Sequence, residues 1–263
     1  MTVDASVFLG HWPFRPIEGT VAGLARMMRA NGIEQAVVSP FEGLFYLDPE
    51  PANAALLRQI AGRKNLWAAP VLNPLIADWR EQLTQFARNP QVRAVRLAPT
   101  FHGYQVSLCA EVAKAAAGKG LALIVQIRVE DERHHSPILN LPPAPVKEVV
   151  AIAAAVPRAR IVVSAARLPE VIEVGRAGPA PRPGRPAPRN VWFDISHFDG
   201  LDCIQRACQT LGAKRLLFST CWPFFYSRSA VLKVEEAEIA ARGRVALMGA
   251  SAHRAFALPR RRL

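Results

Sequence analysis

Eight short runs of apolar and β-branched residues alternate along the chain with longer amphipathic stretches. The runs predict strands at 2–9, 35–39, 66–71, 92–97, 121–127, 160–164, 191–195 and 215–218. The stretches between them predict helices at 20–30, 51–62, 76–88, 107–118, 145–156, 168–175 and 201–211, with two more after the last strand. Such alternation is typical of repeated βα units around a parallel sheet. Eight units close most simply as a (β/α)8 TIM barrel, an α/β fold.

The length of the chain fits one barrel. A (β/α)8 barrel takes roughly 250 residues, and this chain has 263, so we expect a single domain over residues 1–263. Two segments depart from the pattern: a Pro- and Arg-rich insertion at 177–189, and a basic C-terminal tail at 259–263. The insertion precedes the seventh strand, which places it at the face of the barrel opposite the usual active site.

The net charge of +12 raises nucleic acid as a partner. Seven arginines in or beside the insertion and in the tail account for much of this charge, and removing seven from twelve leaves +5. No basic helix with interleaved aromatic residues accompanies them, so we expect no specific nucleic-acid partner. No apolar run approaches the roughly 20 residues that span a bilayer, and the N-terminal residues lack a signal-peptide pattern. We therefore predict a cytoplasmic protein with no membrane partner.

The functional groups of such barrels lie at the carboxyl ends of the strands and in the loops that follow. The densest polar cluster follows the fifth predicted strand. Arg96, Arg128 and Arg133 are candidates to hold an anionic substrate, because a guanidinium group matches the planar fork of a carboxylate. Arg96 and Arg128 could equally form structural ion pairs inside the barrel mouth.

The same loops supply candidate acid and base groups. Glu130 or Asp131 could act as a base, with His102 or His135 as its acid partner. The remaining predicted substrate-binding residues are Tyr104, Gln126, Asp194 and Cys221. The Cys221 thiol could equally be a small buried apolar group, since the sequence identifies no neighbouring base.

Aromatic residues gather in the loops that should follow the strands. They include Phe14, Phe41, Phe45, Tyr46, Phe101, Trp222, Phe224 and Phe225. They could line an apolar pocket for a cyclic or aromatic small molecule, form a lid, or form a subunit interface. We therefore predict a small-molecule substrate and leave homo-oligomer formation open.

Several loop motifs together resemble the amidohydrolase superfamily. Residues 4–10 read DASVFLG and resemble its strand-one motif Asp-x-His-x-His-x-Gly, and residues 218–223 read FSTCWP and resemble its strand-eight motif Gly-(Ser/Thr)-Asp-x-Pro. Residues 12–15, 102–104 and 130–137 are similar to the corresponding loops of one branch of that superfamily. The resemblance spans nearly the whole chain and implies the same barrel, with its site at the carboxyl ends of the strands.

The chain departs from the superfamily where metal ligands are expected. Ser6 and Phe8 stand in place of the strand-one histidines, and Gln126, Ala165 and Cys221 replace the residues expected on strands five, six and eight. Zinc takes about three protein ligands, and the side chains of phenylalanine and alanine offer no lone pairs. We therefore predict no metal cofactor, although a divalent metal such as zinc with unusual ligands stays a weaker alternative.

Three functional hypotheses follow. The first is an amidohydrolase-like hydrolase, or a related lyase, that acts on a small carboxylated substrate by metal-independent acid–base chemistry. The second is a catalytically inactive barrel that binds a small acid or a protein partner. The third is a metal-dependent hydrolase with atypical ligands. The sequence favours an enzyme but does not separate the first hypothesis from the second.

Overall fold

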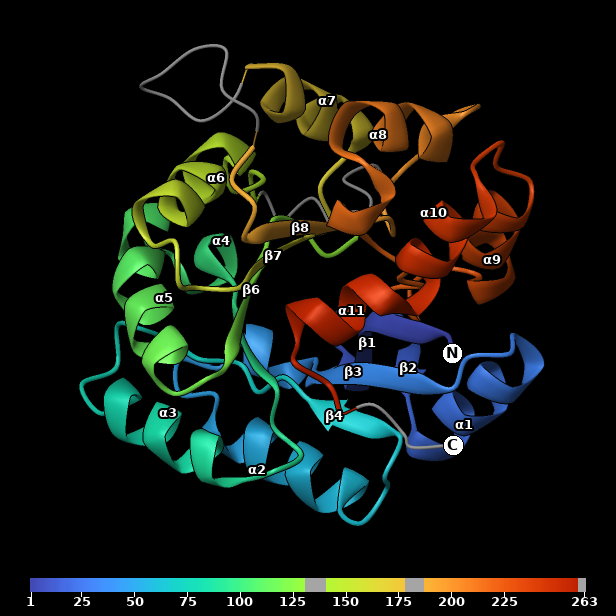
Figure 1. Cartoon of the computed structure of the whole chain (residues 1–263). Coiled ribbons are helices and arrows are strands. Elements are labelled where there is room, and N and C mark those ends of the chain that lie inside the picture. Colours follow the sequence, from blue (N-terminus) through green and yellow to red (C-terminus); the bar gives the residue numbers. More distant parts are fainter. Residues whose placement is uncertain (131–140, 178–186, 260–263) are drawn as a thin grey trace.

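Eight parallel strands form the centre of the molecule within residues 1–130, 141–177 and 187–259, the ranges described by the computed structural model (Figure 1). In chain order they are β1 (Val3–Trp12), β3 (Gln35–Pro40), β4 (Leu66–Ala68), β5 (Ala94–Leu97), β6 (Ala122–Gln126), β7 (Ile161–Ser164), β8 (Val191–Asp194) and β9 (Leu216–Leu217). Each lies within one of the eight predicted runs or overlaps most of it. After β1, each barrel strand has only two to six residues, and all of these residues are buried.

The strands close into a barrel. One sheet has the order β2-β1-β3-β4 and the other β5-β6-β7-β8-β9. Bridges between Ala68 and Val92 and between Val71 and Arg96 join the two sheets on one side. On the other side, the Ala5 amide donates to the Phe218 carbonyl at 2.9 Å. The predicted (β/α)8 fold is therefore confirmed.

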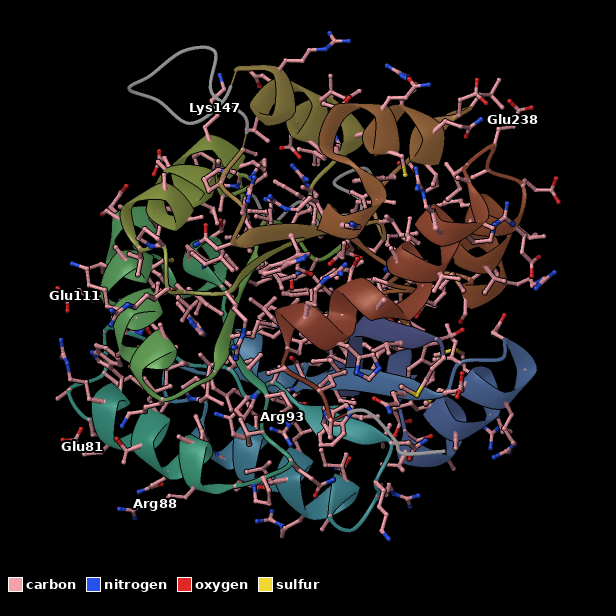
Figure 2. All side chains as sticks on the ribbon, viewed as in Figure 1. Glu81, Arg88, Arg93, Glu111, Lys147 and Glu238 are labelled. Carbon is pink, nitrogen blue, oxygen red and sulfur yellow. The ribbon has the colours of Figure 1, made fainter. Side chains whose placement is uncertain are left out.

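Helices surround the barrel as an outer layer (Figure 1), and the exposed side chains of Glu81, Arg88 and Glu111 extend outward from this layer (Figure 2). Those that follow the first seven barrel strands are α1 (Val21–Ala30), α2 (Glu50–Ile60), α3 (Trp79–Arg88), α5 (Cys109–Gly118), α6 (Val146–Ala155), α7 (Leu168–Ala177) and α8 (Cys203–Leu211). In α3, for example, Trp79, Leu83 and Phe86 recur at helical spacing and are buried against the barrel. After β9 come α9 (Ser227–Glu235), α10 (Ala241–Val245) and α11 (Ser251–Ala255).

Several short elements were not predicted, and two of them follow barrel strands β1 and β5 directly. Strand β2 (Ile17–Gly19) pairs antiparallel with the end of β1, and α4 (Pro99–His102) is a single helical turn after β5. Both are too short to show a hydrophobic period. Their consequence is local: β2 turns the chain back after the 12–16 loop, above the carboxyl ends of the strands.

The barrel interior is apolar at the amino ends of its strands. Trp67, Ala94, Ala122 and Val162 pack there against Phe256, which follows α11 and is fully buried. In Figure 1, α11 crosses this end of the barrel beside β1. Among the described residues, no helix is both long enough and apolar enough to cross a membrane. Apart from Gln35, which accepts the Trp67 indole hydrogen, the amino end of the interior is apolar, and most buried polar groups lie toward the carboxyl ends, where the candidate site lies.

Candidate active site at the carboxyl ends of the strands

A buried arginine occupies the centre of the barrel at this end. The Arg96 side chain has no exposure to solvent; its Nε donates to Ser39 Oγ at 2.8 Å and its Nη2 to Ser6 Oγ at 2.9 Å. Its Nη1 donates to Gln126 Oε1, and its guanidinium group lies 4.7 Å from the ring centre of Phe8. Burial lowers the pKa of Arg96 to about 10, so the group stays charged at neutral pH. It links β1, β3, β5 and β6.

Two buried carboxyl groups lie near this cation. Asp194, at the end of β8, accepts hydrogen bonds from Ser164 Oγ and Ser196 Oγ, both at 2.6 Å. Asp4, in β1, lies 2.6 Å from Thr220 Oγ1 and accepts the Thr220 amide at 3.1 Å. Burial, opposed by these hydrogen bonds and aided by the charge of Asp194, raises the pKa of Asp4 to about 7.

A cavity of about 540 Å³ opens above these groups, beside the ends of β8 and β9. Three cationic side chains line it, and they come from the β1–β2 loop, the segment after β7 and helix α9: Arg15, Arg167 and Lys233. His197 and Thr220 also line it, with an aromatic wall from Phe224 and Phe225. Three cations beside an aromatic wall suit a small anionic molecule with a ring.

His197 lines this cavity, and neighbouring side chains hold its ring, whose Nε2 atom is buried. Its Nδ1 lies 3.0 Å from Ser196 Oγ, whose hydroxyl donates to Asp194, and its ring meets the Phe225 ring edge-on at 5.0 Å. Since the Ser196 hydrogen points to Asp194, the neutral imidazole must carry its hydrogen on Nδ1 to bond Ser196. The basic lone pair is then on Nε2, and Asp194 and Ser196 fix this arrangement.

Glu130 follows β6 and binds Arg15, which lines the cavity, although Glu130 itself does not line it. Its Oε2 accepts from Arg15 Nε at 3.1 Å and Nη2 at 2.5 Å, and its side chain is 1% exposed. Its Oε1 is buried and has no hydrogen-bond partner among the described residues. Glu130 therefore positions one cavity cation and keeps one oxygen for a further donor.

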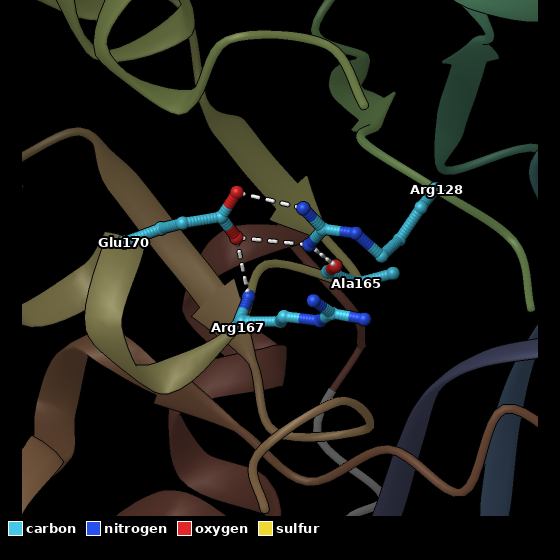
Figure 3. A network of polar contacts seen from close by, with 4 residues as sticks. All are labelled: Arg128, Ala165, Arg167 and Glu170. Atoms are coloured by element: carbon cyan, nitrogen blue, oxygen red, sulfur yellow. Dashed lines mark hydrogen bonds and ion pairs between the residues drawn. The ribbon is translucent and has the colours of Figure 1, made fainter. Parts of the chain in front are cut away.

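Arg128 and Arg167 have different roles although both are close to Glu170 (Figure 3). Arg128 forms a two-pronged pair with Glu170 at 2.8 and 2.7 Å and donates to the Ala165 carbonyl. Glu170 also accepts the backbone amide of Arg167 at 2.6 Å. Figure 3 shows the Arg167 side chain extending away from Glu170, and that side chain lines the cavity. Arg128 is thus held in the wall, and Arg167 is presented to the cavity.

Other predicted site residues lie apart from this cavity. His102 Nε2 lies 3.1 Å from the Gly43 carbonyl, and burial lowers the pKa of His102. Tyr104 packs in the main hydrophobic core, where burial raises the pKa of its hydroxyl. Cys221 is buried near Arg96, and burial raises the pKa of its thiol. Neither His102, Tyr104 nor Cys221 lines the cavity.

Asp131, Arg133 and His135 belong to the segment 131–140, outside the described residues, as does 178–186 of the predicted insertion. By contrast, four residues that line the cavity were not among the predicted site residues. Arg15 and His197 stand in loops directly after predicted strands, which is a usable signal, and Arg167 follows the sixth strand by three residues. Lys233 carries no such signal, because it comes from a helix.

Solved structures of low sequence identity share this fold. The 5-carboxyvanillate decarboxylase of Sphingomonas paucimobilis is 15% identical with a TM-score of 0.74, and the match covers 98% of this chain and 99% of that chain. A dihydroxybenzoic acid decarboxylase from Polaromonas sp., with bound manganese and the inhibitor 2-nitroresorcinol, is 14% identical with a TM-score of 0.74 and coverages of 98% and 97%. An amidohydrolase from Burkholderia multivorans with bound zinc is 16% identical, with a TM-score of 0.70 and coverages of 98% and 100%. No protein-family model and no curated protein sequence matches the chain.

These structures correct the prediction about cofactors. We expected no metal, but divalent metals accompany this fold, manganese in one similar structure and zinc in another, so that prediction is wrong. The residues placed so far do not supply such a site: within 1–130, 141–177 and 187–259, no three His, Cys, Asp or Glu side chains are arranged to hold a metal ion. The oxygen atoms of Ser6, Ser39 and Gln126 surround Arg96 instead.

The comparisons also test the resemblance drawn from the loop motifs. The similar structures include decarboxylases and amidohydrolases, and each match extends over nearly all of both chains. At these identities the likeness concerns the fold. The chain has the barrel fold shared by the amidohydrolase superfamily, as its loop motifs predicted.

Proposed function

We propose that the chain is a hydrolase or lyase that acts on a small carboxylated substrate bound in the cavity beside β8 and β9. The observation that carries this proposal is the convergence of Arg15, Arg167 and Lys233 on one cavity that His197 also lines. The names of similar structures support it, since 5-carboxyvanillate and dihydroxybenzoic acid are carboxylated aromatic molecules. The wall formed by Phe224 and Phe225 would pack against such a ring.

Each of these residues would have a distinct chemical role. The two arginines would bind the carboxylate through paired hydrogen bonds, and Lys233 would add a point charge. His197 would transfer a proton at Nε2, to a carbon that loses carbon dioxide in a lyase or from water in a hydrolase. Glu130 would orient Arg15 and stays a candidate for proton transfer through its unpartnered Oε1. The roles of Asp131, His102 and His135 stay proposals from sequence.

A panel of substituted benzoates, amides and lactones tests this proposal. Each compound is incubated with the wild-type protein, with and without added manganese or zinc, because similar structures contain these metals. Product formation and carbon dioxide release are measured. We expect turnover of at least one aromatic carboxylate, and we expect Arg167→Met to weaken its binding about tenfold or more, since it removes a charged hydrogen bond of roughly 1.5–3 kcal/mol.

The matched control is Arg26→Met. Arg26 is exposed on α1, outside the lining of the cavity, so this change removes the same charge without touching the site. Equal effects of both variants would show that the cavity does not hold the substrate. Specific binding of a carboxylate without turnover would instead support the inactive barrel that binds a small acid.

A further inference from the structure

We propose that Asp4 is a positioning residue that orients the Thr220 hydroxyl, so that Thr220 donates a hydrogen bond to an anionic group in the cavity only while Asp4 is protonated. This inference rests on the proposed function, because it takes the cavity as the site of the carboxylated substrate. Asp4 itself does not line the cavity and would act on the substrate only through Thr220.

The hydrogen bonds around Thr220 carry the inference. Thr220 follows β9, is 1% exposed and lines the cavity. Its Oγ1 accepts the Trp222 amide at 3.1 Å and lies 2.6 Å from Asp4 Oδ2. The other oxygen of Asp4, Oδ1, accepts two backbone amides, from Thr220 at 3.1 Å and Ser6 at 3.3 Å. Because both amides point to Oδ1, a proton on Asp4 belongs on Oδ2, which faces the Thr220 hydroxyl.

A threonine hydroxyl has one hydrogen to donate and two lone pairs to accept with. When Asp4 is ionised it can only accept, so the Thr220 hydrogen points to Asp4 and a lone pair is left toward the cavity. When Asp4 is protonated, its own hydrogen occupies the second lone pair of Thr220. The Thr220 hydrogen is then free to point into the cavity, where it meets a carboxylate favourably.

The surroundings of Asp4 make both states accessible near neutral pH. Burial raises its pKa to about 7, and the charge of Asp194 on β8 acts in the same direction. The other ionisable groups near it are Cys221, whose pKa is raised by burial and by both carboxylates, and Arg96, which bonds Ser6. An anion in the cavity would favour the protonated form of Asp4 further. Binding of a carboxylate should therefore take up a proton.

The test uses benzoate as the probe, because its carboxylate stays ionised across the range from pH 5.5 to 8.5. Its affinity for the full chain is measured by calorimetry at steps through this range. For the wild-type protein we expect constant affinity below about pH 7 and a fall of up to tenfold per pH unit above it. The proton taken up on binding is checked by repeating the titration in buffers with different ionisation enthalpies.

Asp4→Asn is the decisive variant. Asparagine retains the shape, its Oδ1 can accept the same two amides, and its Nδ2 donates permanently to Thr220 Oγ1. This variant should bind benzoate tightly at every pH, without the fall above pH 7. Thr220→Val should bind weakly at every pH, because no hydroxyl remains to donate. Thermal unfolding verifies that both variants are folded.

Two controls separate this inference from its rivals. His197→Gln should keep the fall above pH 7; loss of the fall in this variant and its persistence in Asp4→Asn would assign the pH dependence to His197 and overturn the inference. Asp199→Asn removes an exposed carboxylate that lines the cavity and should also keep the fall.

If wild-type affinity does not vary with pH while Arg167→Met abolishes binding, the cavity is supported as the binding site and the proposed role of Asp4 is refuted. If benzoate and the substituted benzoates do not bind at all, the proposed function itself fails.

Discussion

At the scale of single residues, the ionisable side chains of Asp4, Arg96 and Asp194 are fully buried in the barrel. Arg96 is surrounded by neutral oxygen atoms, whereas Asp4 and Asp194 receive their hydrogen bonds from hydroxyl and amide groups. A buried charge without an ion-pair partner is costly unless hydrogen bonds satisfy it or its pKa shifts. Asp4 shows the second response, since burial raises its pKa from 3.8 to about 7. Its ionisation should therefore be visible in the stability of the protein.

We expect the free energy of unfolding of Asp4→Asn, relative to that of the wild-type protein, to increase as pH rises. The folded-state pKa of Asp4 is raised, so below pH 4 the residue is neutral in both folded and unfolded chains and contributes no pH dependence. Between about pH 4 and 7 the unfolded chain ionises first, and wild-type stability falls by up to about 4 kcal/mol, from three pH units at 1.36 kcal/mol each. Urea unfolding of both proteins at pH 4.5 and 8 measures this difference. A constant difference would show that Asp4 has an ordinary pKa.

At the scale of elements, the start of α7 decides which arginine reaches the cavity. Glu170 lies in the first turn of this helix and binds both the Arg128 guanidinium and the Arg167 amide. Side chains from β6 and α7 are thus fixed to one another by one carboxylate. Removing that carboxylate leaves a buried guanidinium with a weaker partner and frees the turn that carries Arg167.

We expect Glu170→Gln to lower stability by about 2 kcal/mol and to weaken carboxylate binding, because both functions depend on the same side chain. Glu173→Gln is the matched control on the same helix, since Glu173 pairs with Lys147 at the exposed surface. That change should cost less than about 1 kcal/mol and leave binding unaltered. Equal losses in the two variants would argue against a special role for Glu170.

At the scale of the whole molecule, the residue that follows α11 covers the amino ends of the barrel strands. Phe256 is fully buried at the amino ends of the strands, in contact with the interior layer of the barrel. We expect Phe256→Ala to lower the free energy of unfolding by about 3–5 kcal/mol, because it leaves a cavity in this layer. Leu232→Ala, at a 40% exposed position on α9, should cost about 1 kcal/mol or less. Denaturant unfolding followed by tryptophan fluorescence distinguishes them, and similar midpoints would contradict the closing role of this segment.

The sequence predicts the architecture better than the site. Barrel strands leave a signal in every repeat, because each is a buried apolar run, and all eight were predicted. Site residues leave a weaker signal: Arg128 and Arg167 look equivalent in the sequence, yet only the pairing with Glu170 directs one into the wall and the other to the cavity. Lys233 reaches the cavity from a helix after the last strand, which no rule about strand ends anticipates. The metal prediction failed because missing motif residues were taken to exclude a cofactor.

The contact between β1 and the last strand has a consequence for biosynthesis. The Ala5 and Phe8 amides donate to the carbonyls of Phe218 and Trp222, so these partners of β1 are translated more than 200 residues after it. At ribosomal speeds of 5–20 residues per second, roughly 10–40 s pass between the synthesis of β1 and the synthesis of the residues that bond this edge. During that interval the nascent chain presents an unpaired, apolar strand edge, the kind of surface that chaperones cover.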